Sequence, residues 1–192
     1  KKILNHSILT NDKASIIISG GSSPINILHD LDNTDICWQK INVMLLDERL
    51  VDIKNKNSNE SNLKENFFKN YSKSAKYQSI RSLKIDNKID VAIMGFGIDG
   101  HFASIFPCHI NDKKFIDVTK EPMILKTSQM GKPHVNRLTM NLSAFSRVEN
   151  IFIVINSEQK LKVIKEAKKN IKLPIHYLLK LKNSNIHTVL DF

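Results

Sequence analysis

Residues 90–107 read DVAIMGFGIDGHFASIFP. The apolar run at 90–95 does not alternate with polar residues, which is typical of a strand that is covered on both faces. It ends in a turn with three glycines, which allow the backbone to bend sharply. Asp99 and His101 lie in that turn, and a carboxylate beside an imidazole is typical of a general base. The plainer alternative is a histidine that only caps its own loop.

The rest of the chain alternates short apolar runs with helical patterns. Further strands are predicted at 14–19, 41–48, 122–128, 137–142, 150–156 and 186–191, and helices at 25–31, 58–71 and 157–170. In 58–71, Leu63, Phe67 and Tyr71 fall on one helical face. The alternation predicts a single α/β domain over residues 1–192, with a doubly wound, mostly parallel, Rossmann-like sheet and helices on both faces. Ligands of such sheets bind at the carboxyl ends of the strands.

Polar turns also follow the first two predicted strands. The first turn, SGGSSP at 19–24, precedes a helix and is typical of a phosphate cradle, although a tight turn without a ligand has the same pattern. The second, DER at 47–49, places Arg49 where it could bind a phosphate or a developing oxyanion, with Asp47 or Glu48 orienting it. A local ion pair at the surface is the alternative. If the three strands are neighbours, their turns converge on one crevice.

Composition limits the class of protein. The net charge is +10, and nearly all of the positive charge is lysine spread along the chain, with only four arginines. This distribution predicts a solvated basic surface and no nucleic-acid partner. The alternative is that the excess charge helps to attract an anionic substrate. No apolar stretch approaches the length of a membrane span, and the start of the chain lacks the pattern of a signal peptide. Cys37 and Cys108 are expected to be buried thiols in a reducing compartment, the cytoplasm, and no cluster of residues suggests a metal.

Five segments carry a resemblance when they are taken together. They are SGGSSP (19–24), LLDERLV (45–51), NSNESNL (57–63), GFGIDGHFASIFP (95–107) and RLTMNL (137–142). In this order and spacing they resemble the 6-phosphogluconolactonases, whose fold is similar to that of glucosamine-6-phosphate deaminases and ribose-5-phosphate isomerases. The resemblance implies hydrolysis of 6-phospho-D-glucono-1,5-lactone to 6-phospho-D-gluconate in the oxidative pentose phosphate pathway. It also implies a cytoplasmic monomer or homodimer without a cofactor, a metal, or a nucleic-acid or membrane partner.

The same resemblance implies roles for individual residues. His101 would activate water as the general base, with Asp99 orienting it, and Arg49 would bind substrate and stabilise the charge on the carbonyl oxygen. The residues that would bind the rest of the substrate are Gly20, Gly21, Ser22, Ser23, Asp47, Arg137 and Lys132. Of these, Arg137 would bind the phosphate, assisted by Lys132 or His134.

The sequence also departs from the family, and two rival functions remain open. Only a short remnant precedes residue 14, so we expect the family's N-terminal helix to be lacking; in addition, GGSSP replaces the usual GGSTP, and Leu50 replaces an aromatic residue. One rival is a glucosamine-6-phosphate deaminase, but that family has F-N-E-P where this chain has Ser104–Pro107 without an acid, and Tyr in place of Arg49. The other rival is a protein that binds a sugar phosphate, or nucleic acid, without catalysis.

Overall fold

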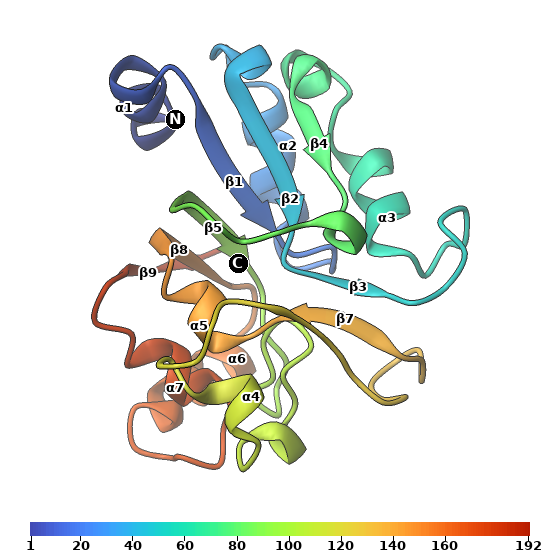
Figure 1. Cartoon of the computed structure of the whole chain (residues 1–192), viewed down its shortest axis with the longest axis vertical. Helices are drawn as coiled ribbons and strands as arrows, with labels where there is room; N and C mark the ends of the chain where they lie inside the picture. Colours follow the sequence, from blue (N-terminus) through green and yellow to red (C-terminus); the bar gives the residue numbers. More distant parts are fainter.

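The computed structural model describes residues 1–192 and contains two sheets (Figure 1). The larger sheet has six parallel strands in the order β4-β2-β1-β5-β8-β9. These strands are β1 (Ala14–Ile18), β2 (Ile41–Leu45), β4 (Lys76–Gln78), β5 (Ile89–Met94), β8 (Val148–Ile155) and β9 (Asn185–Leu190). Because β1 lies between β2 and β5, the turns that follow these three strands lie at one edge of the sheet, as predicted.

Helices cover both faces of this sheet, because successive side chains of each strand point to opposite sides. On one side, Ile16 and Ile18 pack in a core with residues of α1 (Lys2–Asn11), α2 (Ile25–Asp32) and α3 (Asn59–Asn66). On the other side, Ile17 packs in a larger core with α4 (Lys113–Ile116), α5 (Leu142–Phe145), α6 (Glu158–Ala167) and α7 (Ile175–Leu179). The predicted doubly wound α/β architecture is therefore confirmed.

A second, antiparallel sheet was not predicted. It consists of β3 (Asp47–Arg49), β7 (Arg137–Met140) and β6 (Ile124–Lys126), in the order β3-β7-β6. The prediction of one strand over 41–48 is wrong, because the chain leaves the parallel sheet after β2. Leu46 is the connection: its N–H donates to Ile18 O, while its carbonyl accepts from Met140 N of the second sheet. The DER turn thus becomes a strand whose neighbour is 88 residues further along in the register Arg49 to Arg137.

The helix predicted over 58–71 is shorter than expected. Leu63 and Phe67 are buried as predicted, but α3 ends at Asn66 and Phe68 has a φ of 64°. The buried carboxylate of Asp32 accepts hydrogen bonds from the following segment, which turns into the 3₁₀ helix η2 (Tyr71–Ser74). Tyr71 is consequently 53% exposed instead of packing beside Phe67.

Two other expectations need correction. A helix, α1, does precede the first strand: Leu4 is buried in the core and Ser7 Oγ donates to Asp90 Oδ1 at 2.6 Å. Cys37 and Cys108 are free, as expected, but both are exposed, because they lie beside and within the short surface helices η1 (Trp38–Lys40) and η4 (Pro107–His109).

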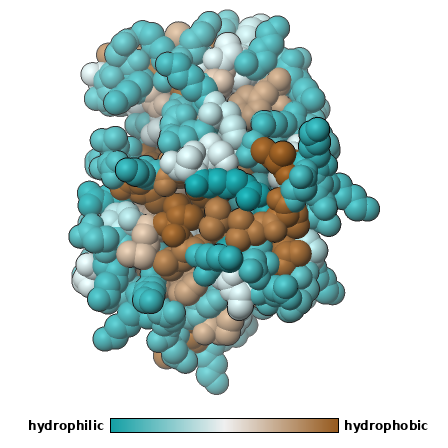
Figure 2. Space-filling model, turned by 45° about the vertical axis from the view of Figure 1, so that its right-hand side comes forward, coloured by the Kyte–Doolittle hydropathy of each residue, from teal (hydrophilic) through white to brown (hydrophobic).

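The surface is mainly hydrophilic on the face shown in Figure 2, where a band of hydrophobic residues crosses the middle. This band separates the hydrophilic surface of this face into an upper and a lower part. None of the helices combines the length and the apolar character that are needed to cross a bilayer.

Candidate active site

The turn after β5 brings Asp99 and His101 together. Asp99 Oδ1 lies 2.5 Å from His101 Nδ1 and also accepts from the His101 backbone N–H at 3.2 Å. Burial acts to raise the pKa of Asp99, but the hydrogen bond and charge of His101 outweigh it, so that the pKa is lowered. The imidazole stacks on Phe106 with 4.6 Å between ring centroids and stays 31% exposed. Since Asp99 occupies Nδ1, the Nε2 atom is the one available to a water molecule or a ligand.

Two arginines stand opposite each other across β3 and β7. Arg49 and Arg137 are register partners, so their side chains leave the second sheet on the same face. Neither forms an ion pair with a carboxylate. Burial lowers the pKa of Arg137, which is only 5% exposed. Like charges directly opposite each other destabilise a sheet, and the charges of Asp47 and Glu48 only partly offset the effect of burial on Arg137, so this pair suits a further, bound anion.

Both guanidinium groups bind backbone carbonyls and keep donors free. Arg49 Nη1 donates to Asn57 O at 3.0 Å, and its buried Nε has no partner. Arg137 donates from Nε to Met130 O at 3.2 Å and from Nη2 to Pro133 O at 3.1 Å. The guanidinium of Arg137 also lies over the ring of Phe106, 5.6 Å from its centroid. Phe106 therefore contacts both His101 and Arg137, which links the third turn to the second sheet.

Asp47 and Ser104 join the same two parts of the site. Ser104 is fully buried; its Oγ donates to Asp47 Oδ2 at 2.6 Å and its N–H donates to Thr139 Oγ1 at 3.1 Å. The other oxygen, Asp47 Oδ1, accepts from Asn59 Nδ2 at 3.2 Å. Burial raises the pKa of Asp47, although Ser104 and the charges of Arg137, Arg49 and His101 oppose the shift. Asp47 was predicted to bind substrate, but both of its carboxylate oxygens already accept from protein groups.

The first turn lies against the third. Gly95 N donates to Ser19 Oγ at 3.1 Å, and a Cβ atom on Gly95 would come within 2.5 Å of Ser23 Cβ. Only glycine allows this approach at position 95. Gly20 is equally close to Asn59, whose side chain also bonds Asp47, so the first turn reaches the second as well. These contacts bring the three turns together, while the single crevice that was predicted between them stays a prediction.

Lys160 was missed by the sequence analysis. It lies in the first turn of α6, and its Nζ donates to Ser23 Oγ at 2.7 Å. The ammonium group also lies 5.5 Å from the centroid of the Phe96 ring, and burial lowers its pKa. The turn after β8 could have indicated Lys160 from the sequence. This turn is the fourth strand end at the same edge of the sheet, and the helix that follows it is capped by Ser157.

The remaining residues that were predicted to bind substrate make no hydrogen bond or ion pair with His101 or Arg49. Gly20, Gly21 and Ser22 line a cavity of about 160 Å³ that extends to Asn62 and Asn66 of α3 and does not include His101 or either arginine. Lys132 and His134 are exposed in the loop that folds over Arg137, and neither side chain makes a hydrogen bond or ion pair. Contacts thus join the three turns, but of these turns only the first lines this cavity, together with α2 and α3. No group of histidines, cysteines and carboxylates is arranged to hold a metal ion.

The model of the family described as glucosamine-6-phosphate isomerases/6-phosphogluconolactonase matches residues 1–188. The chain belongs to this family. A 6-phosphogluconolactonase of Helicobacter pylori strain J99 is 29% identical over 183 residues, which cover 88% of this chain and 78% of that protein. A 6-phosphogluconolactonase of Neisseria meningitidis serogroup A is also 29% identical, over 91% of this chain and 83% of the relative.

Solved structures of the glucosamine-6-phosphate isomerase/6-phosphogluconolactonase family share the fold. The crystal structure of a 6-phosphogluconolactonase from Shewanella baltica superposes with a TM-score of 0.86 at 24% identity, over 98% of this chain and 88% of the other. That of a putative 6-phosphogluconolactonase from Neisseria gonorrhoeae gives a TM-score of 0.86 at 27% identity, over 98% and 90% of the two chains. The family relationship therefore extends over nearly the whole chain.

Proposed function

We propose that this protein hydrolyses 6-phospho-D-glucono-1,5-lactone to 6-phospho-D-gluconate, the second step of the oxidative pentose phosphate pathway. The observation that carries the proposal is the register pair Arg49 and Arg137, which has no ion-pair partner and which Phe106 links to the Asp99–His101 pair. A substrate with a phosphate and a carbonyl oxygen that becomes negative would supply the missing anions. The names of the relatives support the same reaction.

His101 would act as the general base. Its Nε2 would take a proton from a water molecule as the water oxygen bonds to the lactone carbonyl carbon. The bond from that carbon to the ring oxygen then breaks, and the ring oxygen takes the proton back from the imidazolium. Asp99 would keep the other proton on Nδ1 and stabilise the imidazolium while it exists. Arg49, with a buried donor that has no protein partner, would stabilise the charge on the carbonyl oxygen.

The phosphate would be held apart from the reacting carbon. Arg137 keeps the role expected of it, and Lys160 joins the Gly20–Ser23 turn as a second cation that is already hydrogen-bonded to Ser23. Lys132 remains a predicted contact from the exposed loop. Asp47 would hold the turns together instead of touching the substrate, because its oxygens are already bonded to Ser104 and Asn59.

An assay on the purified protein tests this function. Formation of 6-phosphogluconate is followed by its NADP-dependent oxidation, and the rate without enzyme is subtracted because the lactone also hydrolyses spontaneously. Glucosamine 6-phosphate is supplied in parallel as the discriminating substrate. We expect a lactone turnover well above background and no ammonia from the amino sugar. Ammonia release, or a lactone rate equal to background, would refute the proposal.

We also propose that the protein works in the cytoplasm as a monomer or homodimer, without nucleic acid. Two free cysteines agree with a reducing compartment. Light scattering on the purified protein measures the mass of the assembly. Binding to DNA that persists at raised salt would contradict this part of the proposal.

A further inference from the structure

The orientation of Arg49 depends on the chain that follows it. Residues 50–58, here called the Arg49 loop, run from β3 to the start of α3. Arg49 Nη1 donates to the carbonyl of Asn57, next to the far end of this loop. This is the only hydrogen bond that the Arg49 guanidinium donates. The same guanidinium belongs to the residue that stands opposite the like charge of Arg137. A displacement of the loop would therefore release Arg49 from its place opposite Arg137.

A buried carboxylate closes the Arg49 loop. Glu48 points to the other face of β3 from Arg49, because side chains alternate along a strand. Its Oε1 accepts from Arg49 N and Asn59 N, both at 2.6 Å, and its Oε2 accepts from Ser58 Oγ at 3.0 Å and Glu60 N at 2.8 Å. One carboxylate thus binds both ends of the loop.

Glu48 has no cationic partner. It is 1% exposed and forms no ion pair, so its charge is stabilised by four neutral donors, two of them N–H groups at the N-terminus of α3. A buried charge is costly unless its hydrogen bonds are complete. The loop ends are consequently held in one geometry, since any opening would leave the carboxylate unsatisfied.

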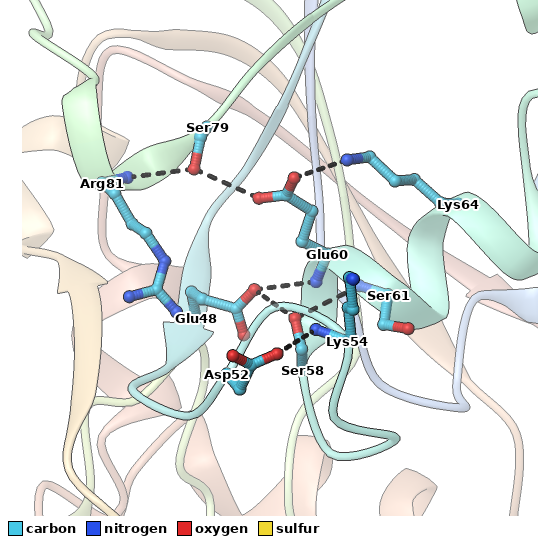
Figure 3. Close-up of polar contacts among 9 residues, drawn as sticks. All are labelled: Glu48, Asp52, Lys54, Ser58, Glu60, Ser61, Lys64, Ser79 and Arg81. Atoms are coloured by element: carbon cyan, nitrogen blue, oxygen red, sulfur yellow. Dashed lines mark hydrogen bonds and ion pairs between the residues drawn. The ribbon is translucent and has the colours of Figure 1, made fainter.

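A second set of contacts braces the loop from outside, and it includes the side chains of Arg81, Ser79 and Glu60 that Figure 3 draws beside Glu48. Arg81 Nη2 donates to Val51 O at 3.0 Å and to Arg49 O at 3.3 Å. Arg81 belongs to the 3₁₀ helix η3 (Ile80–Ser82), and Ser79 caps η3 and donates to Glu60 Oε2 at 3.2 Å. The hydrogen bonds therefore form a closed circuit from β3 through Glu48 to α3, then through Ser79 and Arg81 back to the loop.

We propose that Glu48 is the positioning residue of Arg49: its carboxylate closes the Arg49 loop and thereby holds the guanidinium opposite Arg137, and Arg81 supports the same loop. This inference rests on the proposed function, in which Arg49 contacts the substrate. The two guanidinium groups repel each other, and an arginine free to move would turn toward solvent. Glu48 and Arg81 prevent this before substrate binds, which is preorganisation of the site.

The activity test is a double-mutant cycle. Glu48→Gln keeps the shape but replaces one acceptor oxygen with a donor, and we expect kcat/KM for the lactone to fall about 10- to 100-fold. In an Arg49→Ala background the same change should alter kcat/KM by less than about 2-fold, because Glu48 acts through Arg49. Glu65→Gln, the same substitution on the exposed face of α3, is the matched control and should have no effect. An equal loss in both backgrounds, or no loss at Glu48, would overturn the inference.

Arg81 offers a test that does not disturb a buried group. Arg81→Ala is at an exposed position and should lower kcat/KM about 3- to 10-fold, again only when Arg49 is present. The exposed Arg147→Ala is its control. A loss that persists without Arg49 would count against the role of Arg81. If Glu48→Gln does not fold, this cycle decides the matter.

A measurement without substrate separates the inference from the proposed function. The four arginines give four Nε–Hε signals in a nitrogen-15 spectrum. The order parameter of the Arg49 signal in the parent protein should approach the value of a rigid backbone amide, about 0.85, and it should fall into the flexible range, below about 0.6, in Glu48→Gln. If the parent hydrolyses no lactone but Arg49 still becomes mobile in the variant, the proposed function fails and the positioning role stands. An unchanged order parameter would overturn the positioning role whatever the activity.

Discussion

Replacement of Ser104 by alanine tests the bond that joins the His101 turn to the second sheet. Ser104→Ala removes the 2.6 Å hydrogen bond to Asp47 Oδ2 and leaves that oxygen buried with no protein donor. A hydrogen bond to a charged group contributes about 1.5–3 kcal/mol, and an unsatisfied buried acceptor is costly in addition. We therefore expect the free energy of unfolding at pH 7 to fall by about 2–3 kcal/mol, a large part of the stability of a typical domain.

The pH dependence of this loss follows from the raised pKa of Asp47. A carboxyl group whose pKa is higher in the folded state causes no penalty below its unfolded pKa, where it is protonated in both states. The penalty grows as the pH rises from the unfolded pKa to the folded pKa, where only the folded state still holds the proton, and it is complete above the folded pKa. Without Ser104 the pKa of Asp47 rises further, so the destabilisation by Ser104→Ala should be smallest in acid and grow toward neutral pH.

Urea unfolding of parent and variant, measured from pH 4 to pH 7, gives the two free energies and their difference. Ser61→Ala is the matched control: its hydroxyl makes only an exposed 3.4 Å contact with Glu65, so its effect should stay within about 0.5 kcal/mol. A difference below about 0.5 kcal/mol for Ser104→Ala at pH 7, or one that increases toward acid, would refute the reasoning.

Three further substitutions test the proposed chemistry in the lactone assay. His101→Ala should lower kcat by about two to four orders of magnitude with little change in KM, the range for a lost general base, and turnover like that of the parent would remove His101 from this role. Arg137→Ala should mainly raise KM if it binds the phosphate equally in ground and transition states, and an unchanged KM would exclude it from the phosphate site. Lys160→Met, which keeps the apolar stem, should raise KM about 10-fold with a smaller change in kcat, whereas an effect on kcat alone would place Lys160 near the reacting carbon.

Much of the fold could be predicted because burial on both faces is visible in a local run of residues. ASIIIS and DVAIMG are apolar without alternation, and β1 and β5 form at these places as the central strands. The glycine and serine turns were recognisable for the same reason, since backbone bends and helix caps depend on neighbouring residues. The end of α3 was not predictable, because the acceptor that turns the chain there, Asp32, comes from another helix.

In the candidate site, too, contacts between residues close in sequence could be predicted and contacts between distant residues could not. Asp99 and His101 are two positions apart, so their contact follows from a single turn, and the sequence was sufficient to predict it. The partners of Arg49 and Lys160 are Arg137 and Ser23, which lie 88 and 137 positions away. No local pattern reports such pairs. Glu48 shows what the sequence could not predict, because the segment DER does not reveal which of its two acids is placed to orient Arg49, or through which contacts.

By itself, the sequence determined the alternation of strands and helices, the edge of the sheet where the polar turns lie, and the Asp99–His101 pair at that edge, because each depends on interactions between residues close in the chain. The tertiary structure alone decided that the DER segment leaves the main sheet, that Arg49 and Arg137 become register partners without an ion pair, and that the buried Glu48 carboxylate binds both ends of the loop after Arg49. Those features arise where Leu46 passes the chain from one sheet to the other, and where hydrogen bonds are completed only by segments that folding brings together.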